Sequence, residues 1–352
     1  MKRALLQGIE RIGLLRLAER LGSERPGLFK VLLYHRIGER DGSDEVLDPY
    51  GLSATPEEFA AHMRFIARRH RPISAAELVA ALGGEAELAP GAVLVTFDDG
   101  YRSFMDHAWP IARKWGVPLT LFVVTGHVGY TGGGFWWDEV YRAVATTPAG
   151  YVTAPELGAL PLVTAAQRRA AWERIAQHLK RLPRAEMLET VTYLRSILGG
   201  QQGERRERVV LNWDELRRLA AEGVAVASHT RTHPVLSRVS LTEAREEITG
   251  AQEDLRRELG SPCPLLAYPH GKTGDFTPEV ARLAAEAGLT AAFTTEEGHN
   301  VVGKTPPFSL HRMEISDQRT VSGLRLRLSP LYPIWLKGRK LKDGLRGRRS
   351  LR

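Results

Sequence analysis

The chain contains a single cysteine among its 352 residues, which removes one common means of stabilising a fold. Cys263 has no second cysteine with which to form an intrachain disulfide, and this suits a reducing compartment without establishing one. The chain also lacks an apolar run of the roughly 20 residues that a membrane-spanning helix requires. Hydrophobic residues make up 43% of the chain, so there is ample material for a large core.

The N-terminal residues also lack the features of a secretory signal peptide. Glu10, Arg11 and Arg16 interrupt the apolar stretch within the length that the hydrophobic region of a signal peptide needs. The apolar residues recur instead at near-helical spacing, at Leu5, Ile9, Ile12, Leu15 and Leu17. This spacing predicts an amphipathic helix within residues 1–25, which either packs on the protein or contacts a membrane. We therefore expect a cytoplasmic protein, with peripheral contact to the inner membrane face as an alternative.

The net charge of +8 is concentrated near the C-terminus. Residues 323–352 contain ten Lys or Arg and one Asp, a charge of +9, so residues 1–322 carry −1. Leucine and aromatic residues interleave with these cations, a pattern that fits either an anionic membrane surface or a solvated tail. Nucleic acid is not an expected partner, because no recognised binding motif accompanies the charge. We assign residues 26–322 to one folded domain and residues 323–352 to a basic tail.

Apolar segments and helical segments alternate between these ends, which predicts parallel β/α topology. The expected strands are residues 29–34, 92–97, 117–124, 224–228, 264–268 and 290–294. Several helices have explicit start signals. Thr55 and Ser240 each stand three residues before a glutamate, as in a capping box, and Asn212 and Thr277 are further N-cap residues.

Residues 131–207 interrupt this alternation. They contain a glycine run and two helical stretches, near 164–181 and 184–199, but no convincing strand. The segment therefore predicts a helical insertion over the strand ends. Trp136 and Trp137 stand at its entrance, where paired indoles either stack on sugar faces or anchor a core.

Two adjacent carboxylates close the expected strand 92–97. Asp98 and Asp99 follow this strand, and Gly100 comes immediately after them. Adjacent side chains of a strand point to opposite faces, so both carboxylates can serve one site only where the chain curls, as Gly100 permits. The end of this strand is therefore a candidate site with two carboxylates.

Two histidines follow the expected strand 224–228. His229 and His233 are four positions apart, a spacing that puts both imidazoles on one side of a helical turn. Active sites of α/β barrels lie at the C-terminal ends of the strands, where the aspartates also stand. Two neutral imidazoles and one carboxylate form a common ligand set for a catalytic divalent metal, with a position left open for water. The second carboxylate is then free to take a proton.

Three segments resemble signature motifs of the polysaccharide deacetylases, carbohydrate esterase family 4, which share the chitooligosaccharide-deacetylase homology domain. Thr-Phe-Asp-Asp-Gly-Tyr at 96–101 and Ser-His-Thr-Arg-Thr-His-Pro at 228–234 are similar to the first two motifs. Leu-Ala-Tyr-Pro-His-Gly at 266–271 resembles the third motif of exopolysaccharide and biofilm-glycan members. The resemblance covers residues 29–316. It implies an α/β fold, a distorted (β/α) barrel of about seven strands with a helical insertion, that removes N-acetyl groups from a glycan.

The resemblance also implies roles for individual residues. Asp98 is the base, while Asp99, His229 and His233 hold a divalent metal, with zinc as the first expectation and nickel or cobalt as alternatives. Many members hold the base with an arginine of the third motif, and this chain has Tyr268 in its place. The expected substrate contacts are Tyr268, Pro269, His270, Trp136 and Trp137.

Many members carry a late Leu-x-His whose histidine is the general acid. Residues 308–315 contain His311 but no clean Leu-x-His, whereas an early apolar run ends in Leu-Tyr-His at His35. This resembles the circularly permuted biofilm-glycan deacetylases, in which the strand bearing the acid is moved to the front of the barrel. His35 is therefore the first candidate for the general acid and His311 the second. Asp138 is a candidate for orienting this acid, as the fourth-motif aspartate does in relatives.

The sequence thus predicts a metal-dependent hydrolase that deacetylates a polysaccharide or its lipid-linked precursor. Asp98 removes a proton from the attacking water, and the Tyr101 backbone N–H is a candidate donor to the oxyanion. Two alternatives remain, namely another amide or ester hydrolase on this scaffold with a small-molecule substrate, and a catalytically silent glycan-binding module. The base beside the metal ligands argues against the silent module, because binding alone needs no base.

Overall fold

The computed structural model describes residues 26–39, 51–132, 134–199, 208–315 and 320–338. The helix expected within residues 1–25 lies outside these ranges. Parallel strands form the centre of the fold, in the spatial order β11-β10-β9-β6-β5-β1, and all six coincide with expected strands. Their bounds are Leu28–Tyr34 (β1), Ala92–Phe97 (β5), Leu119–Val123 (β6), Ala225–Ser228 (β9), Leu265–Ala267 (β10) and Ala291–Phe293 (β11).

A short late segment joins the two edges of this sheet. β13 (Met313–Glu314) pairs in parallel with β1. Leu310, three residues before it, bridges Phe293 at the end of β11, where its amide donates to the Ala292 carbonyl at 3.0 Å. The expected distorted (β/α) barrel is therefore confirmed, with the segment from Leu310 to Glu314 as its seventh strand position.

Shorter strands extend the barrel at its edges. β12 (Asn300–Val301) pairs antiparallel with the start of β1, and β4 (Arg71–Pro72) pairs with β5. β2 (Arg36–Ile37) and β3 (Leu52–Ala54) form a separate two-stranded ladder after β1. The amide of His35 donates to the Ser53 hydroxyl at 2.8 Å, so this ladder fixes the chain where β1 ends.

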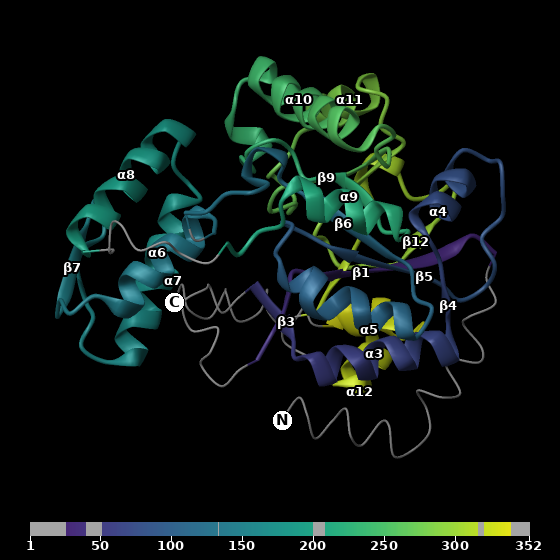
Figure 1. Cartoon of the computed structure of the whole chain (residues 1–352), viewed down its shortest axis with the longest axis horizontal. Coiled ribbons are helices and arrows are strands. Elements are labelled where there is room, and N and C mark those ends of the chain that lie inside the picture. Colours follow the sequence, from purple (N-terminus) through teal and green to yellow (C-terminus); the bar gives the residue numbers. More distant parts are fainter. Residues whose placement is uncertain (1–25, 40–50, 133, 200–207, 316–319, 339–352) are drawn as a thin grey trace.

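Helices cover the barrel on opposite sides (Figure 1). α9, α10 and α11 lie on one side, and α3, α5 and α12 lie on the other. Their bounds are Pro56–Arg69 (α3), Trp109–Lys114 (α5), Trp213–Ala221 (α9), Leu241–Leu259 (α10), Pro278–Glu286 (α11) and Val321–Leu328 (α12). One set of alternate strand residues packs with α4 (Ala75–Leu82) in a single apolar cluster. The other set packs with the covering helices in two clusters, β1, β5, β6 and β9 with α3, α5, α9 and α12, and β10 and β11 with α10 and α11.

The helix start signals are confirmed with one exception. Thr55 and Asn212 each form a complete capping box, and Thr277 accepts from the Val280 amide. Ser240 accepts from the Glu243 amide at 3.1 Å, which is only half of the expected box. The Glu243 carboxylate instead binds Arg184 at 3.1 Å, because this cation from the insertion offers a stronger, charge-assisted partner than a backbone amide.

The insertion forms a lobe beside the barrel, with its own apolar core around Trp172 (Figure 1). The two helices expected near 164–181 and 184–199 are confirmed. The lobe consists of α6 (Trp136–Thr146), β7 (Tyr151–Ala154), β8 (Gly158–Pro161), α7 (Ala165–Leu179) and α8 (Arg184–Ile197). The expectation of no strand here is wrong, because β7 and β8 form an antiparallel hairpin. Each strand has only four residues, too few to give a clear alternating pattern.

The first part of the basic tail belongs to the barrel. Leu324, Leu326 and Leu328 of α12 are buried, as is Tyr332, and α12 packs on α3. The interpretation of residues 323–352 as one solvated or membrane-bound tail is therefore wrong for these residues, whose apolar side chains already lie in the core. Residues 339–352 lie outside the described ranges. Within those ranges, no helix is long and apolar enough to cross a membrane.

Candidate metal centre

The two carboxylates at the end of β5 reach one site because the chain curls at this point. Asp99 and Gly100 both have left-handed backbone angles, with φ of 74° and 79°. A side chain on Gly100 would also press on Val123, since a Cβ there would lie 3.2 Å from its Cγ1. Glycine is therefore needed after the aspartates, as the sequence indicates. The left-handed turn at Asp99 itself is the feature that the sequence did not reveal.

The two histidines converge through a loop and not through a helical turn. Residues 229–235 have no regular secondary structure, and both Thr230 and His233 have positive φ, at 65° and 62°. The His233 amide donates to the Thr230 hydroxyl at 3.1 Å, which closes a local turn. The expectation that helical geometry aligns His229 and His233 is thus wrong. Their rings nevertheless lie only 4.8 Å apart, because the turn folds back on itself.

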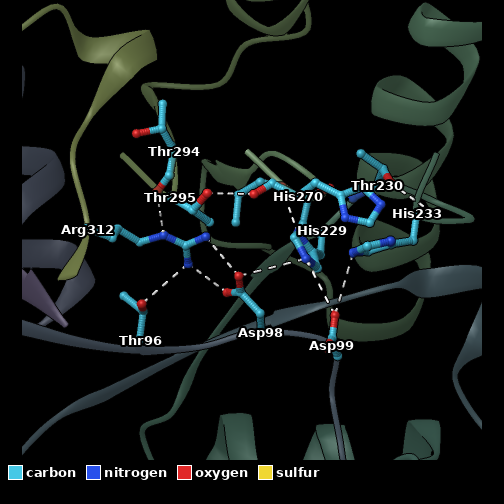
Figure 2. A network of polar contacts seen from close by, with 12 residues as sticks. Thr96, Asp98, Asp99, His229, Thr230, His233, His270, Thr294, Thr295 and Arg312 are labelled. Atoms are coloured by element: carbon cyan, nitrogen blue, oxygen red, sulfur yellow. Dashed lines mark hydrogen bonds and ion pairs between the residues drawn. The ribbon is translucent and has the colours of Figure 1, made fainter. Parts of the chain in front are cut away.

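Asp99, His229 and His233 offer three ligand atoms that lie within 4.8 Å of one another. Asp99 Oδ1 lies 3.5 Å from His229 Nε2 and 3.7 Å from His233 Nε2, and Figure 2 shows both rings turned toward this oxygen. Atoms bound about 2.1 Å from a tetrahedral ion lie roughly 3.4 Å apart, close to these separations. Asp99 Oδ1 is buried and accepts no hydrogen bond from the described residues. The three residues therefore fit a divalent metal.

The protonation states of the three residues suit metal binding. Burial lowers the pKa of His229 to about 4 and the pKa of His233 well below its ordinary value, so both rings are neutral. His229 Nδ1 lies 2.7 Å from the Ala267 carbonyl, which can only accept, so the lone pair remains on Nε2. Burial, with the charges of Asp98 and Asp138, raises the pKa of Asp99 well above its ordinary range. A bound cation would offset this cost of ionising Asp99.

Asp98 is held by a buried arginine that motif comparison did not assign. Arg312 donates to both carboxylate oxygens, at 2.7 and 2.8 Å, and its Nε donates to the Thr294 carbonyl at 2.9 Å (Figure 2). Burial alone would raise the pKa of Asp98, but the charge of Arg312 and its hydrogen bonds lower it overall. Asp98 is therefore an ionised carboxylate, fixed beside the metal ligands by an arginine on the closing strand.

Replacing Arg312 by Met should lower the free energy of unfolding by about 3–5 kcal/mol at pH 7, because the Asp98 carboxylate would stay buried without its cation. Urea denaturation followed by circular dichroism measures this loss. Arg312→Lys is the matched variant, since it keeps the charge but loses the two-pronged contact, and we expect an intermediate loss. Equal stabilities of the Met variant and the wild-type protein would show that the pair does not support the fold.

The structure separates the two candidate acids. His35 lies at the end of β1 and lines the same cavity as Asp98, Asp99 and His229. His311 does not line that cavity. Its backbone exchanges two hydrogen bonds with the Asn300 side chain, and its ring lies against Gly298. The geometry therefore favours His35 as the residue able to reach a substrate.

The third motif contributes to the cavity unevenly. Tyr268 and His270 line it, whereas Pro269 is buried and does not. The expectation that Pro269 contacts substrate is therefore not supported. Tyr268 stacks on Phe276, with ring centroids 4.1 Å apart, and its hydroxyl donates to the Phe308 carbonyl at 3.1 Å. Tyr268 thus acts largely as a packing residue, and Arg312 supplies the contact with Asp98.

The entrance of the insertion packs directly against the metal centre. Trp137 lines the cavity of about 220 Å³, and its ring centroid lies 4.9 Å from that of His233. Trp136 does not line this cavity and packs on Trp172 in the core of the insertion. The two indoles therefore lie in different places. Trp137 lines the cavity of the metal centre, whereas Trp136 packs on the core of the insertion and lines a neighbouring cavity.

Tyr101 and Asp138 form a buried pair behind the metal ligands. The Tyr101 hydroxyl donates to Asp138 at 2.7 Å and accepts from the Trp137 indole at 2.9 Å. Asp138 also accepts from the Phe135 amide, which caps α6. These contacts connect the insertion with the end of β5. The roles of the Tyr101 amide as an oxyanion donor and of Asp138 as an orienting group remain predictions.

Comparison with known proteins finds a known domain in part of this chain. The family model described as polysaccharide deacetylase matches residues 85–149 and 200–292. The chain carries a polysaccharide deacetylase domain. A chitooligosaccharide deacetylase of Bradyrhizobium sp. is 41% identical over 85 residues, 23% of this chain and 37% of the relative. The poly-beta-1,6-N-acetyl-D-glucosamine N-deacetylase of Staphylococcus epidermidis is 24% identical over 111 residues, 29% of this chain and 37% of the relative. These alignments span little more than a third of each relative.

Solved deacetylase structures share the fold over most of the chain. The Streptococcus pyogenes deacetylase PplD has a TM-score of 0.58 and 18% identity, covering 87% of this chain and 100% of that one. IcaB from Ammonifex degensii has a TM-score of 0.55 and 19% identity, covering 86% of this chain and 97% of that one. At these identities the likeness concerns the fold.

The matched segments of the deacetylase domain contain part of the site. Asp98, Asp99, His229 and His233 lie within them, whereas His35 and Arg312 do not. The interval between the segments, residues 150–199, holds β7, β8, α7 and α8. Most of the insertion therefore lies outside the matched segments, whereas α6 lies inside them.

Proposed function

We propose that the protein is a metal-dependent hydrolase that removes N-acetyl groups from a glycan or from its lipid-linked precursor. The observation that carries this proposal is the position of Asp98. Its carboxylate is fixed by Arg312, and one oxygen lies 3.8 Å from His229 Nε2, beside the three metal-ligating atoms. A base that is adjacent to a three-ligand metal site, but not part of it, matches hydrolysis of an amide by activated water.

The residues of the site divide the work of this reaction. A divalent metal held by Asp99, His229 and His233 would polarise the acetyl carbonyl and lower the pKa of water. Asp98 accepts a proton from the attacking water, and Arg312 keeps the carboxylate ionised and oriented for that transfer. His35 then donates a proton to the departing amine. Trp137, on the cavity wall, offers an aromatic face to the sugar.

Zinc is the metal that we propose first. Two imidazole nitrogens and one carboxylate oxygen form a ligand set that suits zinc, and nickel or cobalt can occupy the same set. Elemental analysis of the purified protein identifies the metal that it carries. Restoration of turnover by each ion, after removal of metal with a chelator, ranks them.

The two candidate acids can be separated by kinetics. A general acid contributes about 10²–10⁴-fold, so His35→Ala should lower kcat by that order without emptying the metal site. It should also flatten the alkaline limb of the pH–rate profile. His311→Ala is the control, and it should change kcat little because His311 lies outside the cavity. The opposite ranking of the two variants would assign the role of general acid to His311.

Acetate release tests the proposed function against the two alternatives. A panel of N-acetylated oligosaccharides should yield acetate in the presence of metal, and small acetamides or acetate esters should be poorer substrates. Faster turnover of the small acetamides or esters would favour another hydrolase on this scaffold. Binding of oligosaccharides without any acetate release would indicate the catalytically silent module.

The proposed membrane contact now rests on a smaller part of the tail. Residues 339–352 contain seven Lys or Arg and one Asp, and these cations would be attracted to an anionic lipid surface. The cations before them include Arg325, which stacks over Phe65 of α3 at 5.5 Å, and Arg327, which is buried. Sedimentation with anionic liposomes at low salt tests this contact.

A further inference from the structure

A second cavity opens beside the metal centre, between the insertion and the segment that follows β9. It has a volume of about 220 Å³. Lys180, His233 and His270 line both this cavity and the one that contains Asp98 and Asp99. A ligand in the second cavity could therefore extend to the metal-binding atoms without leaving the protein surface.

The walls of the second cavity are largely apolar. The insertion and the segment after β9 contribute Leu179, Leu182, Met187, Leu188, Val235 and Val239. The lining residues include no Asp, Glu, Asn or Gln. The side chains of this lining therefore offer no carboxylate or amide oxygen to accept from the rows of hydroxyls that a bare glycan presents. An apolar chain fits these walls well, and Leu188, 48% exposed, extends the apolar surface outward.

The same cavity carries positive charge. Its charged lining residues are Lys180, Arg184 and Arg238. Arg184 is neutralised by Glu243 and Glu247, at 3.1 and 3.0 Å. Lys180 and Arg238 form no ion pair with any residue in the described ranges. Two cations that line an apolar cavity without a carboxylate partner are suited to an anionic group of a ligand.

We infer that the substrate joins its N-acetylated sugar to an apolar chain through a phosphate, and that Lys180 and Arg238 bind this phosphate. The inference rests on the proposed deacetylation. The sugar lies at the metal centre, the phosphate lies between the two cations, and the chain follows the wall formed by Leu179 and Leu182. Most of that wall comes from the insertion, whose residues 150–199 lie outside the matched deacetylase segments.

Three synthetic substrates test this inference through acetate release. They are N-acetylglucosaminyl decyl phosphate, N-acetylglucosaminyl phosphate without a chain, and neutral decyl N-acetylglucosaminide. We expect kcat/KM for the first to exceed that of either of the others by about tenfold or more, because only it fills both the charged and the apolar parts of the cavity. Equal values for all three would overturn the inference and leave the proposed deacetylation intact.

Charge variants assign the effect to the two cations. Lys180→Gln and Arg238→Gln should each lower kcat/KM for N-acetylglucosaminyl decyl phosphate about tenfold more than kcat/KM for neutral decyl N-acetylglucosaminide. Added salt should weaken the preference of the wild-type protein for the phosphate-containing substrate. Arg256→Gln is the matched control, because Arg256 is exposed near the far end of α10. A similar loss in all three variants, or in none, would overturn the assignment.

A binding measurement keeps the inference testable without turnover. Absence of acetate from all three substrates would contradict the proposed deacetylation. Calorimetry that measures the binding of decyl phosphate then tests whether the phosphate site exists. Binding that Arg238→Gln weakens about tenfold and Arg256→Gln leaves unchanged would support the phosphate site. Equal binding by wild-type protein and Arg238→Gln would overturn it.

Discussion

Replacing Asp98 by Asn is expected to lower kcat by about 10²–10⁴-fold while the protein keeps its metal. The reason is that we propose Asp98 as the proton acceptor and not as a ligand, because both of its carboxylate oxygens bind Arg312. Asparagine has the same shape but cannot accept the proton from water. Acetate release and metal content, measured on the same preparation, test both parts of this expectation.

The matched control for this substitution is Asp214→Asn, which removes a carboxylate from the protein surface, where the Asp214 side chain is 87% exposed. It should leave both turnover and metal content unchanged. An Asp98→Asn protein with near-normal turnover would show that another group is the base. Loss of metal in Asp98→Asn would show instead that Asp98 belongs to the ligand set.

Removing a metal ligand is expected to abolish metal binding and turnover together. Asp99→Ala, His229→Ala and His233→Ala each delete one of the three atoms that converge on the site, and two protein ligands are fewer than the three that a catalytic zinc site uses. Loss of an outer-shell partner alone costs 10–100-fold in metal affinity, so loss of a ligand should cost more than about 100-fold. Elemental analysis after dialysis, with acetate release, measures the two losses.

His107→Ala is the control for the histidine variants, because His107 is exposed and lies after β5, outside the cavity. It should retain both metal and activity. A protein that lacks His233 but keeps a full complement of metal would place the metal elsewhere. Normal turnover in any of the three ligand variants after dialysis against a chelator would show that the reaction does not require the metal.

The sequence predicted the central strands and the convergence of Asp99, His229 and His233 for physical reasons that the structure makes clear. Each central strand is buried, so it appears in the sequence as a continuous apolar run. Asp98 and Asp99 follow one such run directly, and His229 follows another. Because the ends of parallel strands meet at one edge of a barrel, proximity could be inferred from the order of elements alone.

The closing strand and its arginine could not be predicted in the same way. β13 has only two residues in regular pairing, so no apolar run in the sequence indicates it. Arg312 and Asp98 are 214 positions apart, and no pattern in either segment indicates the other. The position of Arg312 between Leu310 and Met313 was the one available signal, since an arginine that becomes buried among apolar residues needs a carboxylate partner.

Local backbone conformation was the other limit. The spacing of His229 and His233 indicated a helical turn, whereas the structure uses left-handed residues at Thr230 and His233. Such conformations depend on contacts with the rest of the fold. Here the Thr230 hydroxyl accepts from the His233 amide, and the Thr230 carbonyl accepts from the amide of Thr125 in the loop after β6. The closeness of His229 and His233 was therefore predicted from a helical spacing, whereas a left-handed turn brings the two rings together.

Titration of the metal-free protein with zinc tests the central claim most directly. The protein is stripped with a chelator, zinc is added in steps, and acetate release from an N-acetylglucosamine oligomer is measured at each step. We expect release to rise linearly up to one zinc per chain and then to remain constant, because the three residues form one site. Full acetate release before any metal is added, or none at one equivalent of zinc, nickel or cobalt, would contradict the account.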